Sequence, residues 1–151
     1  MNRPDKLTDL ELVLSRSTGQ PEAVFDLTAS QATAVEDALS YYRRVRFAGQ
    51  ALEADAVQAM RAMDSVSEQA HRRGDATVPA VMRIDSADAG TLSEAVGLYV
   101  AERDVESYQP PEERERIATL TELSGPLRQV AIDLRIAEAQ LAAQARQPAY
   151  A

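Results

Sequence analysis

The chain has 151 residues, a formal net charge of −8 at pH 7 and no cysteine. The negative charge opposes attraction to phosphate backbones and anionic lipids, and the lack of thiols excludes disulfides, cysteine nucleophiles and sulfur-based zinc sites. Because there is no export signal and no apolar run long enough to cross a bilayer, we expect a cytoplasmic protein that binds neither nucleic acid nor membranes directly.

Two short strands are predicted near the N-terminus. Leucine alternates with other residues from Leu10 to Leu14, so one face of this segment is apolar. A second short strand is predicted from Val24 to Leu27, and residues 17–21 between the two segments are of types common in turns. The pattern predicts an N-terminal hairpin.

Two helices are predicted after this hairpin. Thr28 and Gln31 have the spacing of a capping box, so a first helix should begin there and run to about Phe47, before Gly49 breaks its pattern. A second helix should end near Gly74, because cations followed by glycine are common at helix C-termini. Its expected apolar face consists of Leu52, Ala56, Met60, Met63, Val66 and Ala70.

A third strand and a third helix are predicted next. The strand spans Ala76 to Ile84, and Pro79 should place it at a sheet edge or bulge because proline cannot donate to a ladder. Asp85 or Ser86 should cap the helix that follows.

The remaining chain predicts two more helices. A fourth helix should run from Pro111 to Leu123 and be broken or kinked at Gly125 and Pro126, and a fifth should continue to about Ala145. Two apolar stripes on the fifth helix favour deep burial; they are Leu127, Val130, Leu134 and Leu141, and Ile132, Ile136, Ala139 and Ala143.

The predicted fold is therefore α+β and predominantly helical, with about five helices and a small sheet of about three strands. We expect one domain over 1–146 and a disordered tail over 147–151. Scarce lysine and abundant alanine indicate the coding bias of a GC-rich bacterial genome.

An internal repeat is suggested by two segments 57 residues apart, Val24–Phe47 and Val81–Asp104, which align without a gap. A duplicated strand–helix–helix unit would give repeat halves 22–74 and 79–146. Any two amphipathic strand–helix units share a period, so coincidence of pattern is the alternative. The identical pairs are Val24/Val81, Ala32/Ala89, Ala38/Ala95, Tyr42/Tyr99 and Arg46/Arg103.

Five residues are candidate ligand or anion contacts: Tyr42, Arg43, Arg46, Tyr99 and Arg103. Guanidinium groups offer paired donors to phosphate or carboxylate, and the corresponding tyrosines could flank a pocket between the halves. The plainer interpretation makes the tyrosines half-buried core residues and the arginines, with Arg44, an ion-paired surface.

Sequence motifs give no catalytic residue, no metal site and no cofactor site. Glu68 and His71 have the Glu-x-x-His spacing of di-iron bundles, but those sites need a second such motif and His71 is the only histidine. The alternating charges over residues 112–116 are typical of a solvated helix face.

Three functions are compatible with this pattern. We favour a non-enzymatic interaction or regulatory protein that forms a homodimer through helical and edge-strand surfaces. The first alternative is a small-molecule binder or enzyme with a pocket between the repeat halves. The second is an acidic inhibitor of a nucleic-acid-binding partner, which would present one contiguous negative face.

Overall fold

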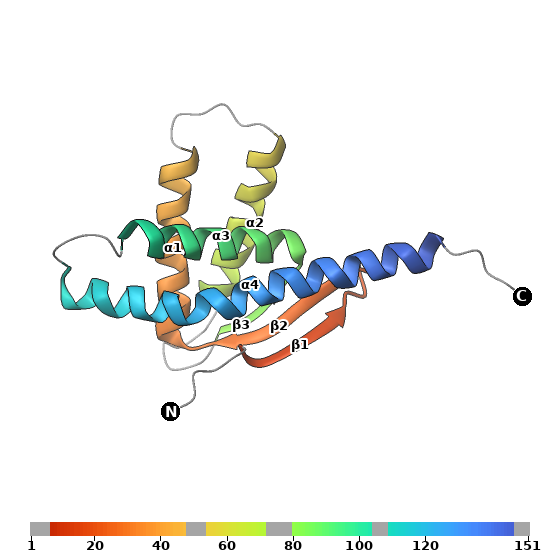
Figure 1. The fold of residues 1–151 in the computed structure, drawn as a ribbon, viewed down its shortest axis with the longest axis horizontal. Coiled ribbons are helices and arrows are strands. Elements are labelled where there is room, and N and C mark those ends of the chain that lie inside the picture. The colour runs from red at the N-terminus through yellow and green to blue at the C-terminus, as the bar shows by residue number, and fades with distance from the viewer. Residues whose placement is uncertain (1–6, 48–53, 72–79, 104–108, 147–151) are drawn as a thin grey trace, which may run out of the picture.

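The computed structural model describes residues 7–47, 54–71, 80–103 and 109–146. Counted over these residues, a three-stranded sheet and four helices make up the fold, so the predicted α+β, predominantly helical class is confirmed, with four helices in place of about five. In chain order the elements are β1 (Thr8–Leu14), β2 (Pro21–Leu27), α1 (Ala29–Phe47), α2 (Ala54–His71), β3 (Ala80–Ile84), α3 (Ser86–Arg103) and α4 (Pro111–Arg146) (Figure 1).

The sheet is antiparallel with the order β1-β2-β3, and the predicted hairpin of β1 and β2 is confirmed. Gly19 takes the left-handed conformation, with φ of 71°, that glycine adopts without steric cost, and it lies in the hairpin loop. Alternate residues of β2 and β3 face the helices and are buried, as a period of two requires. These residues are Ala23, Phe25, Leu27, Ala80, Met82 and Ile84.

Both outer strands have features that limit pairing at their free edges. In β1 the register shifts between Thr8 and Glu11, and Asp9 has a φ of 52°, so the edge is irregular there. In β3 the side chain of Gln69 from α2 pairs with the backbone of Arg83, accepting its N–H at 2.5 Å and donating to its carbonyl at 2.9 Å. The predicted edge position of β3 is confirmed, and α2 satisfies part of that edge.

The predicted helix caps are present. The Thr28 hydroxyl accepts the Gln31 N–H at 3.2 Å, and the Gln31 side chain accepts the Thr28 N–H at 2.9 Å, which is a complete capping box. The Asp85 carboxylate accepts the Asp88 N–H at 2.9 Å at the start of α3. Expectations for Gly49, Gly74, 76–79 and the tail 147–151 fall outside the described residues.

The predicted break at Gly125 and Pro126 is wrong, because α4 continues from Pro111 to Arg146 with Pro126 inside it. The residue before a proline is normally pushed out of the helical region by a clash that involves its Cβ, and Gly125 has none. On either side of this pair, Leu123 and Leu127 are only 3% and 1% exposed. Their packing in one core holds the two segments in a single helix.

The helices form two pairs that cross. Figure 1 shows α1 beside α2 and α3 beside α4, and the second pair runs across the first. In addition, α2 lies against β3 and α4 lies against β2. The core between these layers consists of side chains from all four helices and the inner face of the sheet.

The predicted repeat has a counterpart in this arrangement. Phe25 and Met82, which correspond in the 57-residue shift, lie directly opposite each other in the β2–β3 ladder. The starts of α1 and α3, at Ala29 and Ser86, are separated by the same interval. These placements agree with two halves related by an approximate twofold axis, and the duplication itself stays a prediction.

Candidate functional site

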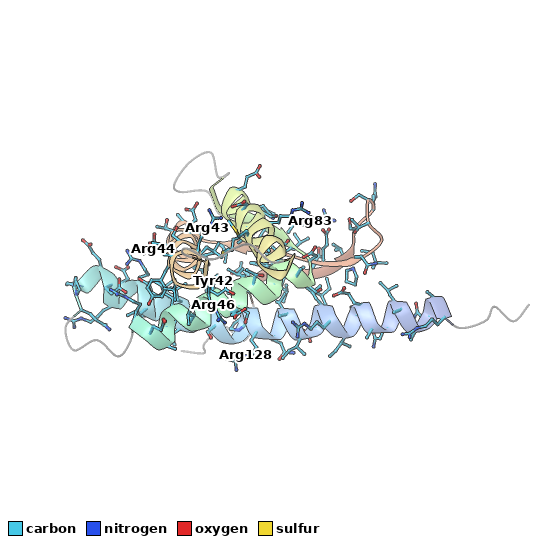
Figure 2. All side chains as sticks on the ribbon, turned by 90° about the horizontal axis from the view of Figure 1, so that it is seen from above. Tyr42, Arg43, Arg44, Arg46, Arg83 and Arg128 are labelled. Atoms are coloured by element: carbon cyan, nitrogen blue, oxygen red, sulfur yellow. The ribbon has the colours of Figure 1, made fainter. Side chains whose placement is uncertain are left out.

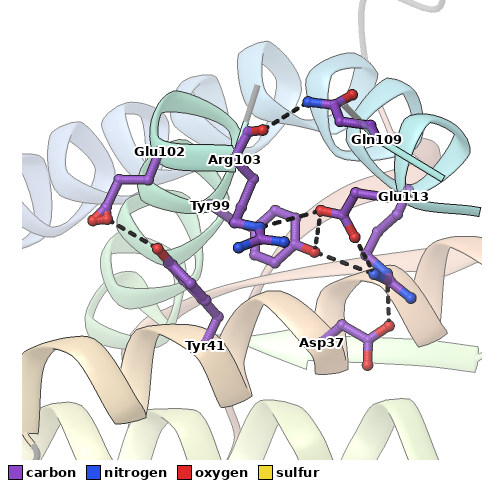
Figure 3. A network of polar contacts seen from close by, with 8 residues as sticks. Asp37, Tyr41, Tyr99, Glu102, Arg103, Gln109 and Glu113 are labelled. Carbon is purple, nitrogen blue, oxygen red and sulfur yellow. Dashed lines mark hydrogen bonds and ion pairs between the residues drawn. The ribbon is translucent and has the colours of Figure 1, made fainter. Parts of the chain in front are cut away.

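A cleft of about 560 Å³ lies where α1, α3 and the first turns of α4 meet. Its volume is in the range of small-molecule sites. Figure 3 shows polar side chains from the three helices converging there. The lining residues are Asp37, Ser40, Tyr41, Arg44, Val45, Tyr99, Arg103, Glu113 and Arg116.

The carboxylate of Glu113 is the centre of the polar network. It belongs to the first turn of α4, and the residue is only 7% exposed. It accepts hydrogen bonds from the Tyr99 hydroxyl at 2.7 Å and from Arg116 at 2.5 Å, with a longer contact to Arg103 at 3.4 Å. A buried carboxylate needs such donors, and here two helices supply them.

The charges of this network are fixed by its hydrogen bonds. Burial alone would raise the pKa of the Glu113 carboxyl, but the hydrogen bond from Tyr99 and the guanidinium groups of Arg116 and Arg103 outweigh burial, so its pKa lies below the ordinary value. Burial and the hydrogen bond to Glu113 raise the pKa of Tyr99. Glu113 therefore stays ionised near neutral pH, which makes it a poor general acid.

Further contacts hold the walls of the cleft. Arg116 also pairs with Asp37 of α1 at 2.9 Å. The ring of Tyr41 packs edge-on against the ring of Tyr99, with centroids 5.2 Å apart and planes at 77°. The Tyr41 hydroxyl donates to Glu102 at 3.2 Å, so its ring rather than its hydroxyl is available to the cleft.

Only two of the five predicted contact residues, Tyr99 and Arg103, line this cleft. Arg43 pairs with Asp64 of α2. Figure 2 shows Arg43, Arg44 and Arg46 on α1, with Arg128 on the far side of α4.

Tyr42 and Arg46 lie together with Glu94 of α3. Arg46 pairs with Glu94 at 2.7 Å, and burial followed by the hydrogen bond to Glu94 raises the pKa of Tyr42. For Arg43 and Arg46 the ion-paired surface, which was the plainer interpretation, is what the structure contains. Tyr42 and Tyr99 are each 4% exposed, so they are buried more deeply than half-buried core residues.

Sequence patterns did not indicate Glu113, Arg116, Asp37 or Tyr41 as site residues, and all four line the cleft. The expectation of a solvated face over 112–116 is wrong for Glu113, which is buried, and for Arg116, whose side chain is 32% exposed. A signal was present, because Glu113 lies four residues before Ile117 and so continues the buried stripe of α4 by one turn.

A second surface of interest is the outer face of α4. The expectation that both apolar stripes of this helix are deeply buried is wrong for the second one: Ile132 and Ile136 are 44% and 52% exposed, and Ala139 and Ala143 are also exposed. The first stripe turns inward and covers the core, so the second must point away from it.

Neither a metal-ligand group nor a membrane-spanning helix is found among the residues that the structure describes. Within the described residues, no group of histidine, aspartate or glutamate side chains is placed to hold a metal ion. Among the described helices, none combines the length and apolarity needed to span a membrane. His71 ends α2, and its side chain lies outside the described set.

Comparisons of the chain with models of protein families, with curated proteins and with solved structures find no match.

Proposed function

We propose that the chain is a non-enzymatic interaction protein that works as a homodimer, with the outer face of α4 as the contact between the two copies. The observation that carries this proposal is the spacing of the exposed stripe. Ile132, Ile136, Ala139 and Ala143 follow one another at intervals of four, three and four residues, the a and d spacing of a coiled coil. Figure 1 shows the C-terminal part of α4 extending beyond the sheet and the other helices, where a second helix could reach it.

The residues beside the stripe favour a parallel pair of helices. Arg128 and Arg135 follow one flank, and Asp133 and Gln140 follow the other. In a parallel pair the two flanks face each other, so Arg128 would meet Asp133 of the partner subunit. In an antiparallel pair each flank meets its own counterpart, and arginine would meet arginine. Figure 2 shows Arg128 projecting from α4 away from α1 and α2.

The helical face is a better contact than the strand edges that the sequence also suggested. The Gln69 side chain is hydrogen-bonded to the backbone of Arg83 in β3, so those backbone groups are not open to a partner strand. The irregular register near Asp9 interrupts the free edge of β1. The acidic-inhibitor alternative gains no specific support, and two surface carboxylates, Glu22 and Glu94, are paired with arginines.

The test is the mass of the protein as a function of concentration, by sedimentation equilibrium. The stripe is short and half of it is alanine, so we expect a dimer that dissociates at roughly 10 µM. Ile136→Gln removes apolar contact from both copies and should weaken the dimer about a hundredfold. Val81→Gln is the matched control, since Val81 is 63% exposed on the outer face of the sheet. A wild-type protein that is monomeric at all concentrations would contradict the proposal.

A further inference from the structure

We infer that the cleft between α1, α3 and α4 is a binding site for a small organic carboxylate, held by Arg44 at its mouth and by the aromatic wall of Tyr41 and Tyr99. This site lies at the N-terminal end of α4 and does not depend on dimer formation through its C-terminal half.

The charge of the lining identifies the ligand as an anion. Among the described residues that line the cleft, three are arginines and two carry carboxylates, so their formal charges sum to +1 in a chain whose net charge is −8. Arg116 forms ion pairs with Glu113 and Asp37, and Glu113 also contacts Arg103. Arg44 is exposed and has no ion pair with any described residue. It is therefore the guanidinium that can offer its donors to a ligand.

The hydrogen-bond network around Glu113 holds the walls of the cleft in place in the absence of a ligand. Glu113 fixes Tyr99 through the 2.7 Å hydrogen bond and holds Arg116 against Asp37. Binding then requires ordering of little more than the Arg44 side chain, so a small ligand loses less free energy to reorganisation of the protein.

The apolar part of the lining favours an organic carboxylate over inorganic phosphate. Val45 is 48% exposed, and together with the paired rings of Tyr41 and Tyr99 it forms an apolar wall beside the charged groups. A phosphate ion would leave this wall without a contact, and its second negative charge would exceed the single excess positive charge. A monocarboxylate with an aromatic or aliphatic body matches both features.

The experiment is a titration of the full chain with benzoate, followed by backbone amide NMR shifts, with benzyl alcohol and inorganic phosphate as comparison probes. We expect saturable shifts on α1, α3 and the start of α4 with benzoate, at a dissociation constant of about 1 mM, and much weaker binding of the other two probes. Arg44→Gln should weaken benzoate binding about tenfold, because it removes charge-assisted hydrogen bonds.

Arg43→Gln is the matched control, since this neighbouring arginine pairs with Asp64 of α2 and does not line the cleft. Its benzoate affinity should stay within about twofold of the wild type. Both variants change exposed side chains and should keep the wild-type spectrum elsewhere. No saturable shift with benzoate up to about 10 mM would overturn the inference. So would stronger binding of phosphate than of benzoate, or equal weakening by the two substitutions.

Discussion

The two tyrosines that correspond in the 57-residue shift, Tyr42 and Tyr99, lie in different surroundings. Each has an arginine four residues later and a glutamate from a different helix in hydrogen-bonding reach. For Tyr42 that glutamate is Glu94, whose side chain is 50% exposed, and for Tyr99 it is Glu113, whose side chain is 9% exposed. The two tyrosines are equally buried, and the difference lies in the glutamate: Tyr99 contacts Glu113, which is buried in the first turn of α4. One arrangement of residue types thus gives a surface ion pair in one half and a buried network beside a cleft in the other.

The largest difference between the surroundings of Tyr42 and Tyr99 should appear when each glutamate is removed. Glu113→Ala leaves Arg103, Arg116 and the Tyr99 hydroxyl without their shared acceptor, and we expect it to lower the free energy of unfolding by about 3 kcal/mol. Glu94→Ala removes an exposed ion pair and the acceptor of the Tyr42 hydroxyl, and it should lower the urea midpoint far less than Glu113→Ala does. Urea unfolding at pH 7 measures both. Equal losses for the two substitutions would show that the surroundings do not differ in the way described.

Removal of the tyrosine hydroxyls should have a smaller effect on stability, and the effect should differ between Tyr99 and Tyr42. Tyr99→Phe removes a hydrogen bond to an ionised, buried carboxylate, which should cost about 1.5 kcal/mol. Tyr42→Phe removes a hydrogen bond to an exposed glutamate, so the cost should be below about 0.5 kcal/mol. Thermal unfolding of the two variants side by side checks the order. A larger loss of stability for Tyr42→Phe than for Tyr99→Phe would show that the stronger hydrogen bond is not the one from Tyr99 to Glu113.

The smallest effect concerns the helix caps. Gln31 is neutral, but its counterpart Asp88 has a pKa raised to about 7 by burial and by the nearby carboxylates of Asp85 and Glu22. The folded chain then binds a proton that the unfolded chain has lost, so stability should fall as pH rises from about 4 to about 7. Partial exposure screens this effect, and we expect less than about 1 kcal/mol. Asp88→Gln should flatten the profile of unfolding free energy against pH; a profile unchanged by the substitution would contradict the raised pKa.

Local signals were sufficient to predict most of the fold. The alternation in Leu10–Leu14 and the capping box of Thr28 and Gln31 depend only on neighbouring residues, and both predictions are confirmed. The predicted break at Pro126 failed because burial of Leu123 and Leu127 in one core outweighs the local preference of proline. Such packing is set by segments far apart in the chain.

The cleft was harder to predict than the fold because three helices build it. Tyr99 and Arg103 were identified from the repeat, but their partner Glu113 lies outside the aligned segments and looked like part of a charged surface. Its burial follows from how α4 packs on α3, which the spacing from Glu113 to Ile117 and Leu120 indicates only after the direction of the buried stripe is known.

Charge reversal across the α4 contact tests parallel dimer formation most directly. Arg128→Asp would place two aspartates opposite each other in its own dimer, and Asp133→Arg would place two arginines opposite each other. We predict that each variant alone is more monomeric than the wild type by sedimentation, and that an equimolar mixture forms a heterodimer in which both charge pairs are restored. If the mixture stays as monomeric as the separate variants while the wild type forms a dimer, the helices do not pair in parallel through this face.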